Sequence, residues 1–217
     1  MTLNPIWKTL AASAIALAAC AAIAAPPTLG KNLIKNPGAE AGTGVTDRTS
    51  TLAPPKWTVT GNVTTVIYGV PGMLNSTTPG PTKPGVNYFA GGPNSASSRM
   101  EQRINVKALE DQINTGNIGY SLSAFVGGRL TDDDNAAVTV SFADAAGVNL
   151  GADALPIVKA AERGSATGIL SRKVTGLVPV GTKFILVAVD FTRLASSYND
   201  GYVDALSLIL KESPPGQ

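Results

Sequence analysis

The 217-residue sequence contains no histidine. This absence excludes a Ser-His-Asp triad, histidine-based acid–base catalysis and the common zinc sites. A single cysteine, Cys20, leaves no possibility of a disulfide within the chain, so stability must come from a hydrophobic core, with or without a bound metal. Neither a Gly-x-Ser-x-Gly elbow nor a Ser-x-x-Lys motif occurs, so the sequence shows no common serine nucleophile.

Charged and aromatic residues are also scarce. Charged residues make up 15% of the sequence, and the formal net charge is +2. Because affinity for nucleic acid depends on many contacts between cations and phosphates, a chain without a basic run does not favour nucleic acid as its partner. Aromatic residues account for 6%. Since sugar sites commonly stack pyranose rings on exposed aromatics, few residues qualify as sugar contacts.

Residues 1–24 are typical of an export signal peptide. Lys8 precedes an apolar stretch from Leu10 to Ala24 that ends in small residues and is too short to span a membrane. No second long apolar run follows, so residues 25–217 are expected to form one secreted or periplasmic domain. An alternative to the cleaved signal peptide is a lipid anchor. The four residues ending at Cys20 resemble a lipoprotein cleavage box, and a lipid on Cys20 would hold the protein at the outer membrane.

The rest of the sequence favours an all-β sandwich. Short runs rich in Val, Ile, Thr, Phe and Tyr are separated by clusters of glycine, proline and asparagine. Apolar residues alternate with polar ones over 120–126 and 138–142, whereas 184–189 is apolar on both faces and is predicted to lie in the middle of a sheet. One helical turn is expected over 108–113, and 69–85 is predicted as a long loop. Further strands are expected at 32–35, 58–60, 63–68, 86–89, 100–106, 170–174 and 202–210.

Two segments near the ends of the expected domain carry a recognisable pattern. Residues 32–42 read Asn-Leu-Ile-Lys-Asn-Pro-Gly-Ala-Glu-Ala-Gly, and residues 200–208 read Asp-Gly-Tyr-Val-Asp-Ala-Leu-Ser-Leu. Together with Trp57 and the segments 87–92, 120–124 and 178–182, they resemble the galactose-binding-like β-sandwich superfamily. The resemblance implies a jelly-roll β-sandwich of two antiparallel sheets. This superfamily includes the non-catalytic carbohydrate-binding modules of bacterial glycoside hydrolases and free-standing exported bacterial domains.

The resemblance also implies a structural calcium between the first and last strands. Glu40 and Asp204 stand at the positions of its carboxylate ligands. The chain departs from the pattern at two positions, since Ala39 replaces a common aromatic residue and Ala205 replaces a common asparagine.

Strand periodicity gives a separate argument about Asp204. It predicts that Asp204 shares an apolar face with Tyr202, Leu206 and Leu208. A carboxylate on such a face must be paired, hydrogen-bonded or bound to metal, and calcium prefers six to eight oxygen ligands. The alternatives are that Asp204 faces water at a register break, or that it pairs with Lys35 or Arg193.

Three residues are candidates for contact with a glycan, and they are Tyr198, Arg193 and Tyr88. Tyr198 and Arg193 lie in or beside a polar loop at one end of the expected sandwich. The acidic run 132–135 has no EF-hand glycine or closing glutamate, so it is interpreted as a solvated turn rather than as a second ion site.

The sequence therefore predicts a secreted, non-catalytic module that binds a polysaccharide or glycan and contains a structural calcium site. The alternative is a structural or adhesive protein of the cell envelope that recognises no sugar. A glycosidase could be built from two of the 15 acidic residues, but no aromatic-flanked acids or cleft-forming insertions mark such a site.

Overall fold

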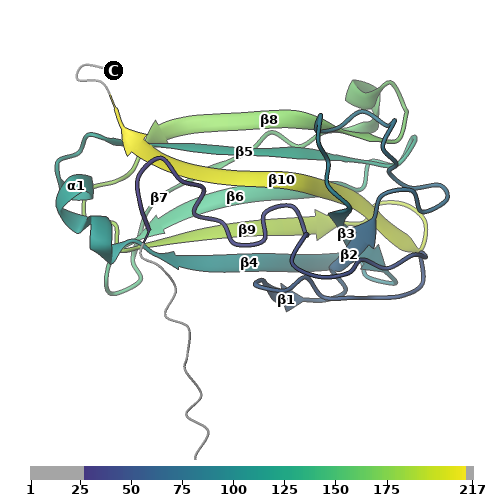
Figure 1. The fold of residues 1–217 in the computed structure, drawn as a ribbon, viewed down its shortest axis with the longest axis horizontal. Coiled ribbons are helices and arrows are strands. Elements are labelled where there is room, and N and C mark those ends of the chain that lie inside the picture. Colours follow the sequence, from purple (N-terminus) through teal and green to yellow (C-terminus); the bar gives the residue numbers. More distant parts are fainter. Residues whose placement is uncertain (1–26, 214–217) are drawn as a thin grey trace, which may run out of the picture.

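The computed structural model describes residues 27–213, which form two five-stranded antiparallel sheets packed face to face (Figure 1). One sheet has the strand order β2-β3-β10-β5-β8 and the other β1-β4-β9-β6-β7. The predicted signal peptide and Cys20 lie outside the described residues. The strands are β1 (Thr58–Thr60), β2 (Thr64–Ile67), β3 (Asn87–Pro93), β4 (Ser97–Asn105), β5 (Ile118–Gly128), β6 (Asn135–Ala143), β7 (Asn149–Ala154), β8 (Gly168–Leu177), β9 (Phe184–Thr192) and β10 (Tyr198–Glu212).

The predicted all-β sandwich is confirmed, and alternation explains how its core forms. In β6, Val138, Val140 and Phe142 are buried between the sheets, while the hydroxyl residues between them face outward. β9 lies in the middle of its sheet, as predicted. Its outer face is nevertheless only partly covered, because Phe184 and Leu186 remain half-buried.

The helical turn is confirmed, with slightly different bounds. It consists of a 3-10 turn, η1 (Lys107–Leu109), followed by α1 (Glu110–Asn114). A second 3-10 turn, η2 (Ala160–Arg163), and strand β7 were not predicted. β7 is an edge strand whose burial alternates only between half-buried and exposed positions, so its sequence shows little of the apolar periodicity that marks the inner strands. No helix within residues 27–213 is long and apolar enough to cross a membrane.

The expected strand at 32–35 is wrong, although this stretch does lie beside the last strand. Asn32 forms only an isolated bridge with Ile209. Its side chain takes the place of a regular ladder, since Oδ1 accepts from the amides of Ile34 and Leu208, and Nδ2 donates to the Leu206 carbonyl. The N-terminal segment (residues 27–42) therefore follows β10 without being a strand (Figure 1).

Further backbone bonds hold the N-terminal segment along β10. The amide of Gly30 donates to the Leu210 carbonyl at 2.8 Å, and the amide of Leu206 donates to the Pro37 carbonyl at 3.0 Å. The beginning and end of the domain consequently lie side by side over several residues, which is the arrangement that a site shared by Glu40 and Asp204 requires.

The predicted loop at 69–85 contains no strand or helix, but it is not merely a surface connection. Val70, Met73 and Leu74 are buried against a second apolar cluster on the outer side of the β2-β3-β10-β5-β8 sheet. This cluster includes the rings of Tyr88 and Tyr202. The loop thus covers aromatic surface that the sheet would otherwise expose.

Candidate functional site

The side chains of Glu40 and Asp204, here called the acid pair, both approach Gly38. A Cβ atom placed on Gly38 would be 3.2 Å from Asp204 Oδ1 and 3.9 Å from Glu40 Cγ. The two acids come from opposite ends of the sequence and meet because the N-terminal segment follows β10. Glycine at this position leaves space between them.

A β-bulge explains how Asp204 is aimed. The register of β10 against β5 shifts between Asp204 and Ser207, and Ala205 has a φ of +50°. Because a bulge redirects the side chains around it, Asp204 shares a face with Tyr202 but not with the core residues Leu206 and Leu208. The face predicted from regular alternation is therefore wrong for the two leucines. The alternative, in which Asp204 faces water at a register break, is right about the break but wrong about the exposure, because Asp204 is buried.

Hydrogen bonds hold both carboxylates. The Tyr68 hydroxyl donates to Asp204 Oδ2 at 2.7 Å, and the amide of Ala205 donates to Asp204 Oδ1 at 2.6 Å. Glu40 Oε1 accepts from the amides of Val86 and Asn87 at 3.0 and 2.8 Å. Within the described residues, neither acid forms an ion pair, so the alternative pairing of Asp204 with Lys35 or Arg193 is not observed.

Burial makes the charge on Asp204 costly. Asp204 is 1% exposed, and its pKa is raised from 3.8 to about 7. Loss of solvation is the main cause; the bonds from Tyr68 and Ala205 lower the pKa, while the nearby charge of Glu40 raises it. The acid pair is a place where a positive charge would be favourable.

The atoms around the acid pair suit a hard cation. Glu40 Oε2 accepts no hydrogen bond in the described part of the chain, so it has free lone pairs for a cation. Carboxylate and amide oxygens are ligands that calcium prefers. No cluster of three or more Asp, Glu, Cys or His side chains is found among residues 27–213, so carbonyls and water would have to complete the coordination.

The three predicted glycan contacts do not form a binding surface. Tyr88 and Tyr198 are 0% and 3% exposed, so neither ring can stack on a sugar. Tyr88 packs against Tyr202 with the ring centroids 5.3 Å apart. Half-buried Arg193 donates to the Ser197 carbonyl and organises its own loop. These tyrosines were misassigned because a polar sequence context does not show that the loop at 69–85 and Arg48 cover them.

The acidic run 132–135 is not the solvated turn that the sequence predicts. Asp134 is fully buried, and its carboxylate accepts from the amides of Leu194, Ala195 and Asp200 at 2.6 to 2.9 Å. Asp133 accepts from the amide of Ala160. The run therefore ties together the loops at one end of the sandwich.

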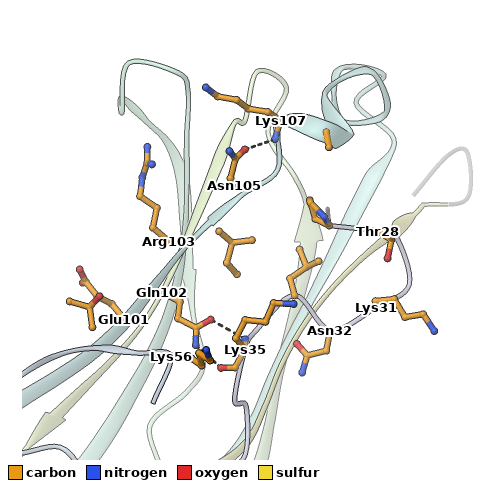
Figure 2. Close-up of a pocket in the computed structure, with 15 residues that line it drawn as sticks. Thr28, Lys31, Asn32, Lys35, Lys56, Glu101, Gln102, Arg103, Asn105 and Lys107 are labelled. Atoms are coloured by element: carbon orange, nitrogen blue, oxygen red, sulfur yellow. Dashed lines mark hydrogen bonds between the residues drawn. The ribbon is translucent and has the colours of Figure 1, made fainter. Parts of the chain in front are cut away.

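A cleft of about 860 Å³ opens between the N-terminal segment and β4, whose residues from both faces line it (Figure 2). Here it is called the basic cleft, because five of its residues are lysine or arginine and one is acidic. Its apolar lining includes Leu33 and Ile104. The residues that line it are Pro27, Thr28, Lys31, Asn32, Leu33, Lys35, Lys56, Thr58, Glu101, Gln102, Arg103, Ile104, Asn105, Lys107 and Ala108.

Gln102 fixes one wall of the basic cleft to the other. Its Oε1 accepts from the Lys35 amide at 3.0 Å, and its Nε2 donates to the Lys35 carbonyl at 2.6 Å. This reciprocal pair joins β4 to the N-terminal segment in the way that a strand ladder would. No motif or charge run predicts the basic cleft, since its cations are spread over residues 31–107 and meet only in the fold.

Comparisons with known proteins identify the fold. No family model and no curated protein sequence matches the chain. The Stig cyclase Fisc from Fischerella sp. TAU is 15% identical over 84% of this chain and 98% of the cyclase, with a TM-score of 0.56. The active domain of bacteriophage CBA120 tailspike protein 4 is 14% identical over 83% of this chain and 21% of its own, with a TM-score of 0.49. A family 16 carbohydrate-binding module is 19% identical over 58% of this chain and 77% of its own, with a TM-score of 0.38.

These similarities concern the fold alone. The protein is a two-sheet β-sandwich, consistent with the galactose-binding-like fold that the sequence resembles. The identities lie below 20%, so what the protein does has to be argued from its own residues.

Proposed function

We propose that the protein is a secreted, non-catalytic module that binds carbohydrate in the basic cleft. The observation that carries the proposal is the cleft itself, which is open, has room for several sugar units and combines long polar side chains with an aliphatic lining. The resemblance of the sequence to a superfamily that includes carbohydrate-binding modules supports the same function. The basic cleft replaces Tyr198, Arg193 and Tyr88 as the proposed sugar contact.

We also propose that calcium is bound at the acid pair and has a structural role. Glu40 and Asp204 would hold it, and the ion would supply the positive charge that the buried carboxylate lacks. Bound calcium would join the N-terminal segment to β10. It would therefore stabilise the fold without taking part in a reaction.

A glycan array with the purified protein tests the binding function. Binding to at least one polysaccharide class in calcium buffer is expected, and a substitution in the basic cleft should weaken it. If no class binds, a structural or adhesive role in the cell envelope becomes the better account. Hydrolysis of chromogenic glycosides by the purified protein would contradict the non-catalytic part of the proposal.

The mass of the protein recovered from the producing cell tests its location. Cleavage by signal peptidase after Ala24 would leave a chain that begins at Ala25. A mass that corresponds to a lipidated Cys20 would instead support an outer-membrane lipoprotein. Recovery of the whole chain from the cytoplasm would contradict export.

A further inference from the structure

The basic cleft brings together cations that are far apart in the sequence. Lys31 and Lys35 come from the N-terminal segment, Lys56 from the loop before β1, Arg103 from β4 and Lys107 from η1. Figure 2 shows the Lys35 side chain reaching across the opening, with Arg103 on one side and Lys31 on the other. The whole chain has a net charge of only +2, so the positive charge is concentrated here rather than spread evenly.

Within the described residues, no ion pair neutralises these five cations, although Arg103 and Lys107 lie over the Phe184 ring. In residues 27–213, none of their side-chain nitrogens forms an ion pair or a hydrogen bond with another protein group. The one acid of the cleft, Glu101, is held by Arg99 at 2.7 Å and does not neutralise them. Five cations around one opening repel one another, and a bound anion would remove this cost.

The neutral polar groups of the cleft, by contrast, are largely committed to the fold. Gln102 is bonded through both side-chain atoms to Lys35, and Asn32 is bonded through both to neighbouring backbone. Asn105 Oδ1 accepts from the Lys107 amide. The donors left for a ligand are therefore mostly cationic, which selects for carboxylate or sulfate groups over neutral hydroxyls.

The backbone at Lys56 supports a role for its side chain. Lys56 has a φ of +74°, in a region that favours glycine and, among other residues, asparagine or aspartate. A lysine here costs stability that a glycine would not, and its side chain is exposed at the cleft.

The surface beside the cleft suits an extended ligand. Arg103 lines both the basic cleft and a neighbouring depression of about 250 Å³ over β9 and β6. Its guanidinium lies 3.2 Å from the centroid of the Phe184 ring and so occupies the aromatic face of that depression. The lining of the basic cleft itself contains no aromatic residue. Single-stranded nucleic acids rely on stacking their bases on such rings, and neutral sugars commonly stack on them as well, so a ligand of this surface has to be held mainly through its negative charge.

From these observations we infer that the basic cleft binds an anionic polysaccharide, that is, a chain of uronate or sulfated sugars. The inference rests on the proposed carbohydrate-binding function and specifies its ligand class. Lys35 and Arg103 are placed to contact charged groups of the ligand, and the aliphatic side chains between them are placed to contact sugar rings.

The test measures binding by titration calorimetry to polygalacturonate, alginate and heparin, with neutral xylan and a mixed-sequence single-stranded DNA as comparisons. The acidic polysaccharides are expected to bind, and their affinity should fall as salt is raised from about 50 to 200 mM. Lys35→Gln and Arg103→Gln should each weaken binding about fivefold to tenfold at low salt. The matched control, Lys173→Gln, removes the same charge from an exposed position on β8 of the other sheet and should leave affinity unchanged. Melting curves check that every variant is folded.

Each other outcome has a definite meaning. Binding to xylan as tight as to the acidic polymers, without salt dependence, overturns the anionic ligand but keeps the carbohydrate-binding function. Binding to none of the polysaccharides overturns both. A preference for DNA, or an equal loss of affinity in Lys173→Gln, shows that the protein interacts with polyanions through its general charge and also overturns the inference.

Discussion

The substitution Asp204→Asn should remove most of the pH dependence that the acid pair gives to stability when calcium is absent. Asp204 is 1% exposed, and its pKa in the folded protein is about 7, compared with 3.8 when solvated. Its folded pKa is raised, so its contribution to stability is present at acidic pH and is lost as the pH rises from about 4 to above 7. Asparagine keeps the size of the side chain but cannot ionise; its oxygen can accept from the Ala205 amide, and its NH₂ group can donate to the Tyr68 oxygen in place of the bond that Asp204 Oδ2 accepts.

The pKa shift sets the size of the effect. It corresponds to about 4 kcal/mol of unfolding free energy between pH 4 and pH 8, as an upper limit for this group. At pH 8 in chelator, Asp204→Asn should thus be more stable than the wild type, and near pH 4 the two should be similar. Calcium should narrow this difference at pH 8, because it binds the ionised carboxylate; at 100 times its dissociation constant it adds about 2.7 kcal/mol to the wild type alone, which is less than the upper limit of about 4 kcal/mol.

Urea denaturation at pH 4, 6 and 8, with calcium or with chelator, measures these differences. Comparing each variant with the wild type at the same pH cancels the titration of the other acids. Equal stability of the wild type in calcium and in chelator would refute the calcium site. Parallel pH profiles for wild type and Asp204→Asn would refute the assignment of the titration to Asp204.

Three further substitutions test the structure at other points, with urea denaturation as the common measurement. Arg48→Met removes the partner 3.0 Å from fully buried Asp200 and should cost about 3 kcal/mol; no loss would mean that this ion pair does not form. Asp134→Asn leaves a loop amide facing an NH₂ group and should cost about 2 kcal/mol, whereas an ion site would instead show a loss of calcium response. Gly92→Ala should prevent stable folding, because its Cβ would lie 1.8 Å from the Asn62 carbonyl oxygen at a φ of +90°; a folded variant would contradict the packing of β3 there.

The fold could be predicted from the sequence because its strands carry their own signals. β6 is recognisable from alternation and β9 from its continuous apolar character, and both strands contribute buried residues to the same core. β7 has no such signal, since an edge strand with half-exposed side chains needs no apolar face. The N-terminal segment has apolar residues like a strand, but Asn32 and Gln102 replace backbone pairing with side-chain bonds, which propensity does not reveal.

The candidate sites could be predicted from the sequence only where a motif also indicates which residues lie close together in space. Glu40 and Asp204 were predicted to be neighbours because the resemblance places both beside one ion, and the structure brings them together. The predicted glycan contacts rested on residue type alone, and Tyr88 and Tyr198 are too deeply buried in the structure to contact a sugar. The basic cleft was missed because net charge and charge runs describe a chain, whereas a binding surface depends on which side chains the fold collects.

The acid pair and the basic cleft both include residues of the same irregular stretch, the N-terminal segment. Lys35 lies in the cleft wall, Glu40 belongs to the acid pair, and only a short turn separates them. The backbone groups of a regular strand would be paired with those of its neighbouring strands. This segment depends instead on the Gln102 side chain on one side and on β10 on the other. A cation at Glu40 would therefore restrain the same stretch of backbone that positions Lys35. This shared segment gives a physical reason why a calcium with no chemical role could still influence how well the cleft holds its ligand.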